Sequence, residues 1–408
     1  MATEFAPLPV GPSAGMLAPP VSPDALPDAC LDEMMLSVDR DSVCYREVAA
    51  ATAAEVAAGG PQAPLCWGYS GRPTGAEPLL FHTMLLTGFP SQLPLLVASF
   101  LASQCCDAVL WFWLAPPLFA QYGAPGAPAP IRLPAHSAHR VVFKEFSAEA
   151  EFAKVAADFP RANASSLRGV NSISDIRFVT DWARMLLMYV YGGLWVDIDT
   201  VMLRDFRPLF ALAPFAYRAG YTILFNNAVQ RMGKRPHAVT RELLAAAIEK
   251  IDPSPETMSY TLGYARLGQA HSLHFLSQPL FDFMWMRFLR GESPELAAVH
   301  PEMFHAMAHG PHGDKSHEMM RGPHGDVFVN VWSSFFRPVD DDAELARRRA
   351  LPFLPGSFSY HWHNRYNAGL PPRSWAGILL ERYTALAEAK TVCAPGQGGG
   401  AGAGEAAV

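Results

Sequence analysis

The sequence lacks the signals that would mark a nucleic-acid-binding, zinc-binding or secreted protein. Only 17% of the 408 residues are charged, the net charge is −6 and the pI is near 6.2. The basic residues are scattered along the chain, so nothing indicates nucleic acid as a partner. The six cysteines lack the Cys-x-x-Cys spacing of a zinc site. Their pairing, and with it the redox compartment, stays open.

A secretory signal peptide and a membrane-spanning segment are also not visible. Residues 1–28 are rich in proline and contain no apolar run with a basic flank. The most apolar window, 93–120, is interrupted by Gln104 and Asp107 and is closed by Pro116-Pro117. This pattern favours a helix followed by a strand over a membrane span.

Half of the residues are hydrophobic, which is enough to bury a large core. We expect one large domain over 61–392, between an Ala/Pro-rich tail and linker at 1–60 and a Gly/Ala tail at 393–408. Within it, 115–138 is expected to be an irregular surface insertion and 300–326 a His/Gly-rich loop. A second metal site in that loop is the alternative. A solvated loop is preferred, because no cysteine joins the histidines and no histidine pair has a usable helical spacing.

Apolar segments with strand and helix patterns alternate along the chain, which favours a mostly parallel sheet. Thr180 is expected to cap the helix that starts there. The expected strands are 79–86, 108–114, 140–146, 194–196, 200–203, 215–218, 222–229 and 327–332, and the expected helices are 91–104, 148–157, 180–191, 236–251, 273–289 and 370–390.

The residue order of the stretch 180–204 indicates a ligand site. A nearly continuous apolar helix pattern ends at Gly192-Gly193, and a short apolar strand then leads to Asp197 and Asp199. Ligands gather at the carboxyl ends of strands in open α/β sheets. Two carboxylates there are costly to bury without a cation, and carboxylate oxygens suit Mn²⁺ or Mg²⁺, which commonly share their coordination with substrate phosphates. An isolated Asp-x-Asp is also common in turns and caps.

The stretch resembles glycosyltransferases of family 32, which include glycolipid α-1,4-galactosyltransferases and initiating mannosyltransferases, and more distantly the clostridial glucosylating toxins. The resemblance implies an α/β, GT-A-like nucleotide-diphospho-sugar transferase fold, with a mixed, mostly parallel central sheet flanked by helices. The segments that match in type and spacing are Asp181-Trp-Ala-Arg184, Gly192-Gly193, Trp195 and Asp197-Ile-Asp199.

The resemblance also implies an activity and roles for individual residues. It implies metal-dependent and retaining transfer of a hexose from a UDP- or GDP-sugar to a glycan, glycolipid or protein. Asp199 is expected to bind the metal directly, and Asp197 through water or by touching the ribose. Asp181 and Arg184 are expected to hold hydroxyls of the hexose, although the two also form an ordinary helix pair. Trp195 is expected to belong to the substrate site.

Three residues outside the central stretch complete the expected site. His82 corresponds to a histidine of the family's opening strand, near the nucleotide base, but the tryptophan that usually follows is missing. Asn227 is expected to face the donor sugar, with a turn-forming asparagine pair as the alternative. The segment 358–364 resembles the family's closing motif, with its tryptophan one place early. In it His361, rather than His363, is the expected third metal ligand.

Two other functions remain possible at this point. The departures near His82 and in the closing motif would suit an inactive nucleotide-sugar-binding relative. The order Asp197-Ile-Asp199 also fits the opening motif of haloacid-dehalogenase phosphatases, in which Asp340-Asp341 could bind Mg²⁺. The compartment stays open between cytoplasm and secretory pathway. Secretory relatives usually carry an amino-terminal anchor that is not seen here, while Asn163 begins a glycosylation sequon.

Overall fold

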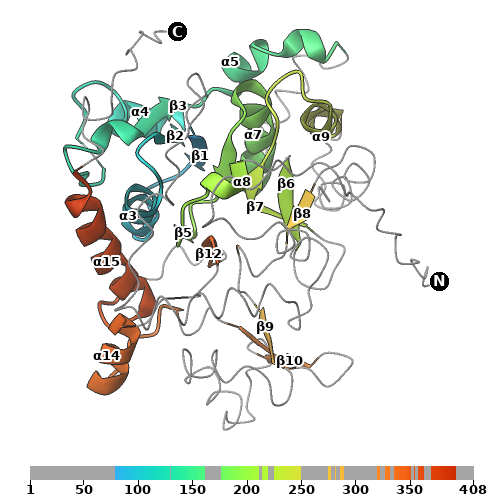
Figure 1. Cartoon of the computed structure of the whole chain (residues 1–408). Helices are drawn as coiled ribbons and strands as arrows, with labels where there is room; N and C mark the ends of the chain where they lie inside the picture. The colour runs from blue at the N-terminus through green and yellow to red at the C-terminus, as the bar shows by residue number, and fades with distance from the viewer. Residues whose placement is uncertain are drawn as a thin grey trace.

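A mixed seven-stranded sheet, in the order β3-β2-β1-β4-β7-β6-β8, forms the centre of the molecule (Figure 1). β1 is parallel to β2 and β4, β2 is parallel to β3, and β6 is parallel to β8, whereas β7 is antiparallel to β4 and β6. The expected α/β class with a mixed, mostly parallel sheet is confirmed. The strands are β1 Leu79–Leu85, β2 Ala108–Leu114, β3 Val141–Glu145, β4 Leu194–Val196, β6 Phe215–Arg218, β7 Phe225–Arg231 and β8 His274–Leu276.

The structure is a computed structural model, and it describes part of the chain. The described residues are 79–128, 130–160, 176–210, 214–218, 225–249, 274–276, 281, 285–288, 319–321, 327–330, 335–350, 353, 357–362 and 369–391. The expected tails, the sequon at Asn163 and most of the His/Gly-rich segment lie outside these residues.

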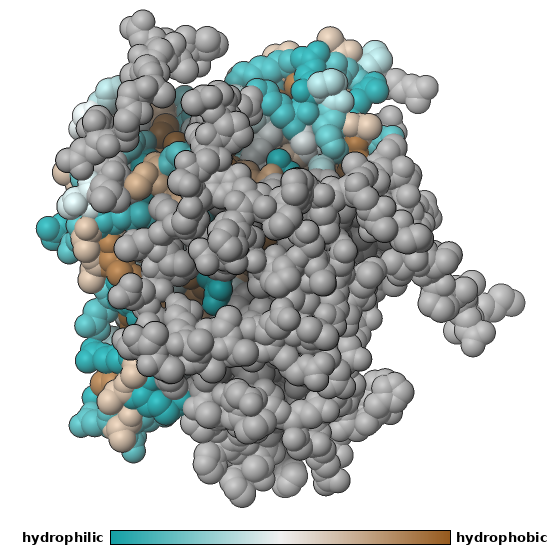
Figure 2. Space-filling model, in the orientation of Figure 1, coloured by the Kyte–Doolittle hydropathy of each residue, from teal (hydrophilic) through white to brown (hydrophobic). Residues whose placement is uncertain are grey.

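Helices cover both faces of the sheet because its strands alternate their side chains between two apolar cores. On β1, Phe81 and Leu85 join the core under α3 and α15, whereas Met84 joins the core under α5, α7 and α9. The exposed side of α5 is largely hydrophilic (Figure 2). The helices are α3 Leu93–Ser103, α4 Pro116–Tyr122, α5 Ala148–Ala153, α7 Ile176–Tyr191, α8 Arg207–Phe210, α9 Ala238–Glu249, α14 Asp342–Ala350 and α15 Trp375–Ala389, with 3-10 turns η1 Ala138–Arg140 and η2 Ala156–Asp158.

Two smaller sheets accompany the central one. β5 (Thr200–Met202) follows the acidic pair directly and pairs antiparallel with β12 (Ser359–His361), which comes from the carboxyl-terminal part of the chain. β9 (Trp285–Phe288), β10 (Met319–Arg321) and β11 (Val327–Asn330) form an antiparallel sheet in the order β10-β11-β9. The β5–β12 pair is the one that matters for the site, because it brings residues 200 and 361 into register.

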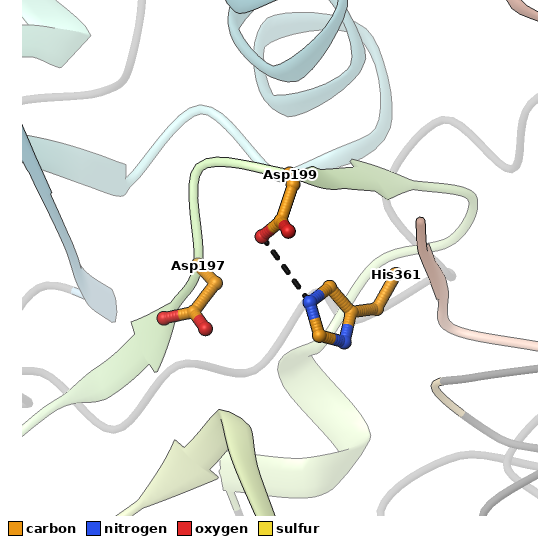
Figure 3. Close-up of side chains that lie close together, drawn as sticks. All are labelled: Asp197, Asp199 and His361. Atoms are coloured by element: carbon orange, nitrogen blue, oxygen red, sulfur yellow. Dashed lines mark ion pairs between the residues drawn. The ribbon is translucent and has the colours of Figure 1, made fainter. Parts of the chain in front are cut away.

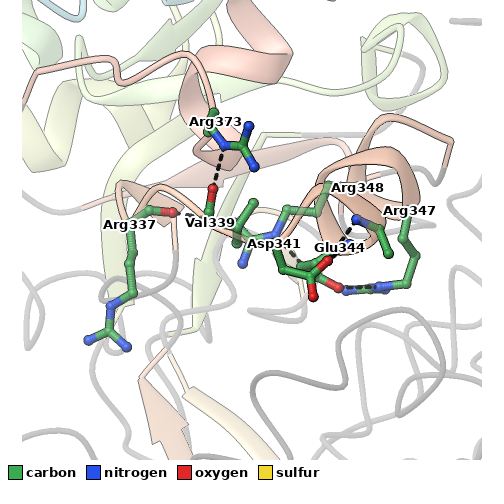
Figure 4. A network of polar contacts seen from close by, with 8 residues as sticks. Arg337, Val339, Asp341, Glu344, Arg347, Arg348 and Arg373 are labelled. Carbon is green, nitrogen blue, oxygen red and sulfur yellow. Dashed lines mark hydrogen bonds and ion pairs between the residues drawn. The ribbon is translucent and has the colours of Figure 1, made fainter.

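Polar contacts hold α14 and join the loop before it to the start of α15 (Figure 4). Arg373 Nε donates to the carbonyl of Val339 at 2.5 Å. Arg348 Nε donates to Glu344 Oε1 at 2.9 Å. Asp341 Oδ1 accepts the backbone N–H groups of residues 343 and 344, which makes Asp341 the cap of α14.

Three expectations about helices are wrong, and strand β10 lies within the segment 300–326 that is expected to be a loop. Helix α7 begins at Ile176, so Thr180 lies inside the helix and does not cap it. The segment 115–138 contains α4, which starts at Pro116-Pro117 because proline is well accommodated in a first helical turn. The expected helix 273–289 contains strands β8 and β9 instead. Pro279 lies between them and would break a helix there.

The apolar window at 93–120 divides into α3, β2 and the start of α4, as its polar and proline residues indicated. Within the described residues, no helix has both the length and the apolar character needed to cross a membrane.

The turn between α7 and β4 requires glycine at two positions. Gly192 and Gly193 have φ angles of 74° and 88°, in the region that favours glycine. A Cβ on Gly193 would lie 2.5 Å from the carbonyl oxygen of Leu80. The turn therefore allows β4 to run close beside β1 and to end at the acidic pair.

We predict that Gly193→Ala destabilises the protein by about 2–4 kcal/mol, from the positive φ together with the clash against a backbone atom. Chemical denaturation monitored by circular dichroism would measure the loss. Gly88→Ala is the matched control, because Gly88 is exposed and has no atom within 4 Å of an added Cβ. Equal stabilities of the two variants would contradict the prediction.

Candidate metal and donor site

Two carboxylates and one imidazole meet at the carboxyl end of β4 (Figure 3). Asp197, Asp199 and His361 each offer a ligand atom within 4.8 Å of the others. His361 Nε2 lies 3.2 Å from Asp199 Oδ1, and these side chains are only 6% and 2% exposed. Within the described ranges, no other three residues among His, Cys, Asp and Glu form such a group. The structure thus brings together the three residues that the sequence named as metal ligands.

Backbone hydrogen bonds fix the positions of the three side chains. Asp197 N–H donates to the carbonyl of Ala228 at 2.7 Å, which extends the β4–β7 ladder by one residue. Trp362 N–H donates to the carbonyl of Asp199 at 2.9 Å, next to the pairing of His361 with Thr200. The cluster therefore depends on two sheets that meet at the acidic pair.

Arg184 links the expected sugar-binding residues to the acidic pair. Its Nη2 lies 3.0 Å from Asp181 Oδ1 and 3.2 Å from Asp197 Oδ1. Its Nη1 donates to the carbonyl of Asn227 at 2.5 Å, while the Asn227 amide donates to Asp181 Oδ1 at 3.0 Å. Arg184 is 5% exposed, and both aspartates are 20% exposed. The structure thus brings Asp181, Arg184 and Asn227 beside the acidic pair.

Trp195 contacts the site through Asp197. Its indole Nε1 donates to Asp197 Oδ1 at 2.6 Å, and Arg184 lies over its ring at 5.2 Å from the centroid. The side chain is buried, at 1% exposure. In this structure, therefore, the indole orients the carboxylate, and the direct substrate contact expected for Trp195 stays a prediction.

The charges of the cluster fit a divalent cation. Burial raises the pKa of the Asp197 carboxyl above its ordinary value. Arg184 opposes that rise, and the neighbouring Asp199 carboxylate adds to it. Two carboxylates and one imidazole are a donor set that suits Mn²⁺ and comparable ions. An ion shared by these atoms would remove the repulsion between the carboxylates.

Tyr217 is a site residue that sequence reasoning missed. It lies on β6, is fully buried, and its hydroxyl is 3.3 Å from His361 Nδ1, on the far side of the ring from Asp199. No motif surrounds it in the sequence. It could have been found only by knowing that a side chain of β6 meets His361 of β12 across two sheets.

His82 lies on β1, where it pairs with Trp195 of β4. Trp113 Nε1 donates to its Nδ1 at 3.1 Å, so Nε2 carries the proton and donates to the carbonyl of Gly192 at 2.9 Å. Both ring nitrogens are thus engaged inside the protein. His82 holds the glycine turn, and its expected contact with the nucleotide base stays a prediction.

Burial lowers the pKa of His82 from 6.5 to about 4, and the positive charge of Lys144 adds to this effect. We expect the ring to stay in the neutral, Nε2-protonated form down to about pH 5, as measured by ¹⁵N NMR of histidine-labelled protein. Because the folded-state pKa is the lower one, unfolding takes up a proton between pH 6.5 and pH 4. The stability from His82 is complete above pH 6.5 and is lost as the pH falls. Titration of the ring near pH 6.5 would contradict this prediction.

For Arg184 we predict that replacement by methionine costs about 3 kcal/mol in the free energy of unfolding, because Asp181 and Asp197 would lose their shared cation. Urea denaturation would measure this. Arg349→Met is the matched control, because its pair with Glu381 is exposed, at 51% and 65%, and should contribute less than about 0.5 kcal/mol. An equal loss of unfolding free energy in both variants would show that the ion pairs of Arg184 contribute no more than an exposed surface pair.

The comparisons with known proteins agree with the location of the site. Residues 136–216 match the family model "Glycosyltransferase sugar-binding region containing DXD motif". This segment holds Asp181, Arg184, Trp195, Asp197 and Asp199. A search of the curated proteins finds no match to this chain.

Several solved glycosyltransferase structures are distantly similar. Galactosyltransferase LgtC in complex with donor and acceptor sugar analogues is 13% identical over 76% of this chain and 95% of its own, with a TM-score of 0.33. GlyE from Streptococcus pneumoniae is 11% identical over 76% of this chain and 62% of its own, with a TM-score of 0.36. Mouse xyloside xylosyltransferase 1 is 12% identical over 50% of this chain and 85% of its own, with a TM-score of 0.30.

The resemblance to family 32 in particular stays a prediction. The family model, matched at residues 136–216, confirms the resemblance of this chain to glycosyltransferases with a DXD sugar-binding region.

Proposed function

We propose that this glycosyltransferase transfers a hexose from a nucleotide-diphosphate sugar, UDP- or GDP-linked, to a glycan, glycolipid or protein acceptor, with Mn²⁺ or Mg²⁺ and with retention of anomeric configuration. The observation that carries the proposal is the group of Asp197, Asp199 and His361 at the end of β4. Arg184 supports it by contacting Asp197 of that group, and Asp181 and Asn227 are joined to Arg184 in turn.

In this proposal, Asp199 and His361 hold the ion directly, and Asp197 holds it directly or through water. A divalent ion bound there would stabilise the negative charge that grows on the diphosphate leaving group as the glycosidic bond breaks. Asp197 Oδ1 already accepts from Trp195 and contacts Arg184. Its second oxygen, Oδ2, is therefore the one assigned to the ion or to the donor ribose.

The hexose is assigned to the side of the acidic pair where Asp181 lies. The Asp181 carboxylate is partly exposed, at 20%, and can accept hydrogen bonds from sugar hydroxyls. Arg184 and the Asn227 amide both donate to it, which fixes its orientation before a substrate arrives. No described residue lies where it would have to act as a covalent nucleophile, so the route to retention is left to experiment.

The two alternative functions find less support. The displaced closing motif favours an inactive relative, yet His361 lies beside Asp199 all the same. A haloacid-dehalogenase phosphatase would need Asp340-Asp341 near Asp197. Instead Asp341 caps α14, and neither residue joins the group at Asp197, Asp199 and His361.

A panel of nucleotide sugars with Mn²⁺ or Mg²⁺ tests the proposal and identifies the base and the hexose. We expect slow metal-dependent hydrolysis of one donor without an acceptor, detected as released nucleoside diphosphate. Turnover of p-nitrophenyl phosphate without turnover of any donor would instead support the phosphatase.

Asp199→Asn should lower donor turnover by at least about 100-fold, since the ion would lose a charged ligand. The thermal midpoint should stay the same or rise, because one of two neighbouring buried carboxylates loses its charge. Asp340→Asn is the matched control. Asp340 is exposed, so its replacement should leave donor turnover within about twofold of the wild type. A large loss of stability in Asp199→Asn would show that the pair is structural.

A further inference from the structure

The contact between Tyr217 and His361 joins the central sheet to the β5–β12 pair. Tyr217 is on β6, His361 is on β12, and the hydroxyl oxygen lies 3.3 Å from Nδ1. Tyr217 is fully buried, and its ring stacks on Phe281 with the centroids 5.4 Å apart. Burial of a tyrosine hydroxyl is costly unless it is hydrogen-bonded, so the contact with His361 lowers the cost of burying Tyr217.

The two nitrogens of the His361 ring face different groups. Nε2 faces Asp199 at 3.2 Å, and Nδ1 faces Tyr217. A neutral imidazole that binds a metal through Nε2 must offer the lone pair of that nitrogen, so its proton is on Nδ1. A hydroxyl oxygen can accept that Nδ1–H. Partners of this kind fix the tautomer and the ring orientation of metal-binding histidines.

We propose that Tyr217 is a positioning residue for the metal site, which holds His361 with its proton on Nδ1 and its Nε2 lone pair towards Asp197 and Asp199. The inference rests on the proposed function, because it takes these three residues as the metal ligands. It adds a residue outside the segment matched by the family model, which ends at residue 216.

Replacement of Tyr217 by phenylalanine tests the role of its hydroxyl alone. Tyr217→Phe keeps the ring that stacks on Phe281 and removes only the hydroxyl. Tyr360→Phe is the matched control. Tyr360 is adjacent to His361 on β12 and is also buried. Because successive side chains of a strand point to opposite faces, Tyr360 lies on the other face of β12 from His361, and its ring packs against Phe335 and Phe353.

Titration of the full chain with Mn²⁺ alone, with free Mn²⁺ measured by electron paramagnetic resonance, tests the proposal. We expect Tyr217→Phe to raise the Mn²⁺ Kd by about 10–100-fold. Tyr360→Phe should leave it within about twofold of the wild type, since the Tyr360 side chain points to the opposite face of β12 from His361. An unchanged Kd in Tyr217→Phe, or an equal rise in both variants, overturns the proposal.

A double variant separates positioning from general destabilisation. If Tyr217 acts through His361, Tyr217→Phe should add nothing to the Mn²⁺ Kd once His361→Ala has removed the imidazole. An equal effect of Tyr217→Phe with and without the imidazole overturns the proposal. Thermal midpoints of all variants check that they fold.

A measurement on the wild-type chain needs no variant. With Zn²⁺ as a diamagnetic probe, ¹⁵N NMR of the His361 ring should show a protonated Nδ1 and a metal-bound Nε2. The reverse assignment overturns the proposal. Wild-type chain that binds neither Mn²⁺ nor Zn²⁺ would overturn both the metal site and the role of Tyr217. Metal binding without turnover of any donor would count against the proposed transferase alone.

Discussion

One guanidinium holds together the parts of the site that are contributed by different elements. Arg184 extends from α7 to Asp197 after β4 and to the backbone of Asn227 on β7, and it also pairs with Asp181 one helical turn earlier. Burying Asp181 and Asp197 beside Asp199 would be costly without this cation. Helix α7, strand β4 and strand β7 are therefore tied at one point, and the acidic pair is positioned relative to that point.

The third residue of the cluster depends on a different constraint. His361 is more than 160 positions further along the chain than Asp199, and it reaches the acidic pair because β12 adds to β5 with His361 opposite Thr200. The bond from Trp362 N–H to the Asp199 carbonyl continues this pairing. A strand that slipped by one residue would turn His361 to the other face of the pair. The register of this short strand pair thus determines whether two or three of these residues lie together.

Site residues that are close together in the sequence were predicted better than residues that meet only in the folded structure. The spacing from Asp181 to Asp199 was readable because helix, glycine turn and strand follow one another directly, and the structure brings these residues together. Tyr217 could not be predicted, since its relation to His361 exists only across two sheets. The helix expected at 273–289 was wrong because Pro279 interrupts it, and the short apolar and aromatic runs on either side of Pro279 fit a helix or a strand until their pairing partners are known. For Trp195, the sequence predicted a position beside the acidic pair, and the structure identifies the Asp197 carboxylate as its hydrogen-bond partner.

The candidate site is only partly contained in the segment that matches the family model. Residues 136–216 supply α7, β4, the acidic pair and β5, whereas Asn227 and His361 lie beyond the match. Asn227 lies on β7 and His361 lies on β12, and each of these strands pairs with a strand of the matched segment. Strand β12 in turn is followed by α15, which packs against the same apolar core as α3. Since the core under α3 and α15 also receives Val201 and Met202 of β5, loss of that packing would displace β5 and His361 together. The packing of α15 therefore supports the positions of Asp199 and His361, although α15 contributes no residue to the cluster.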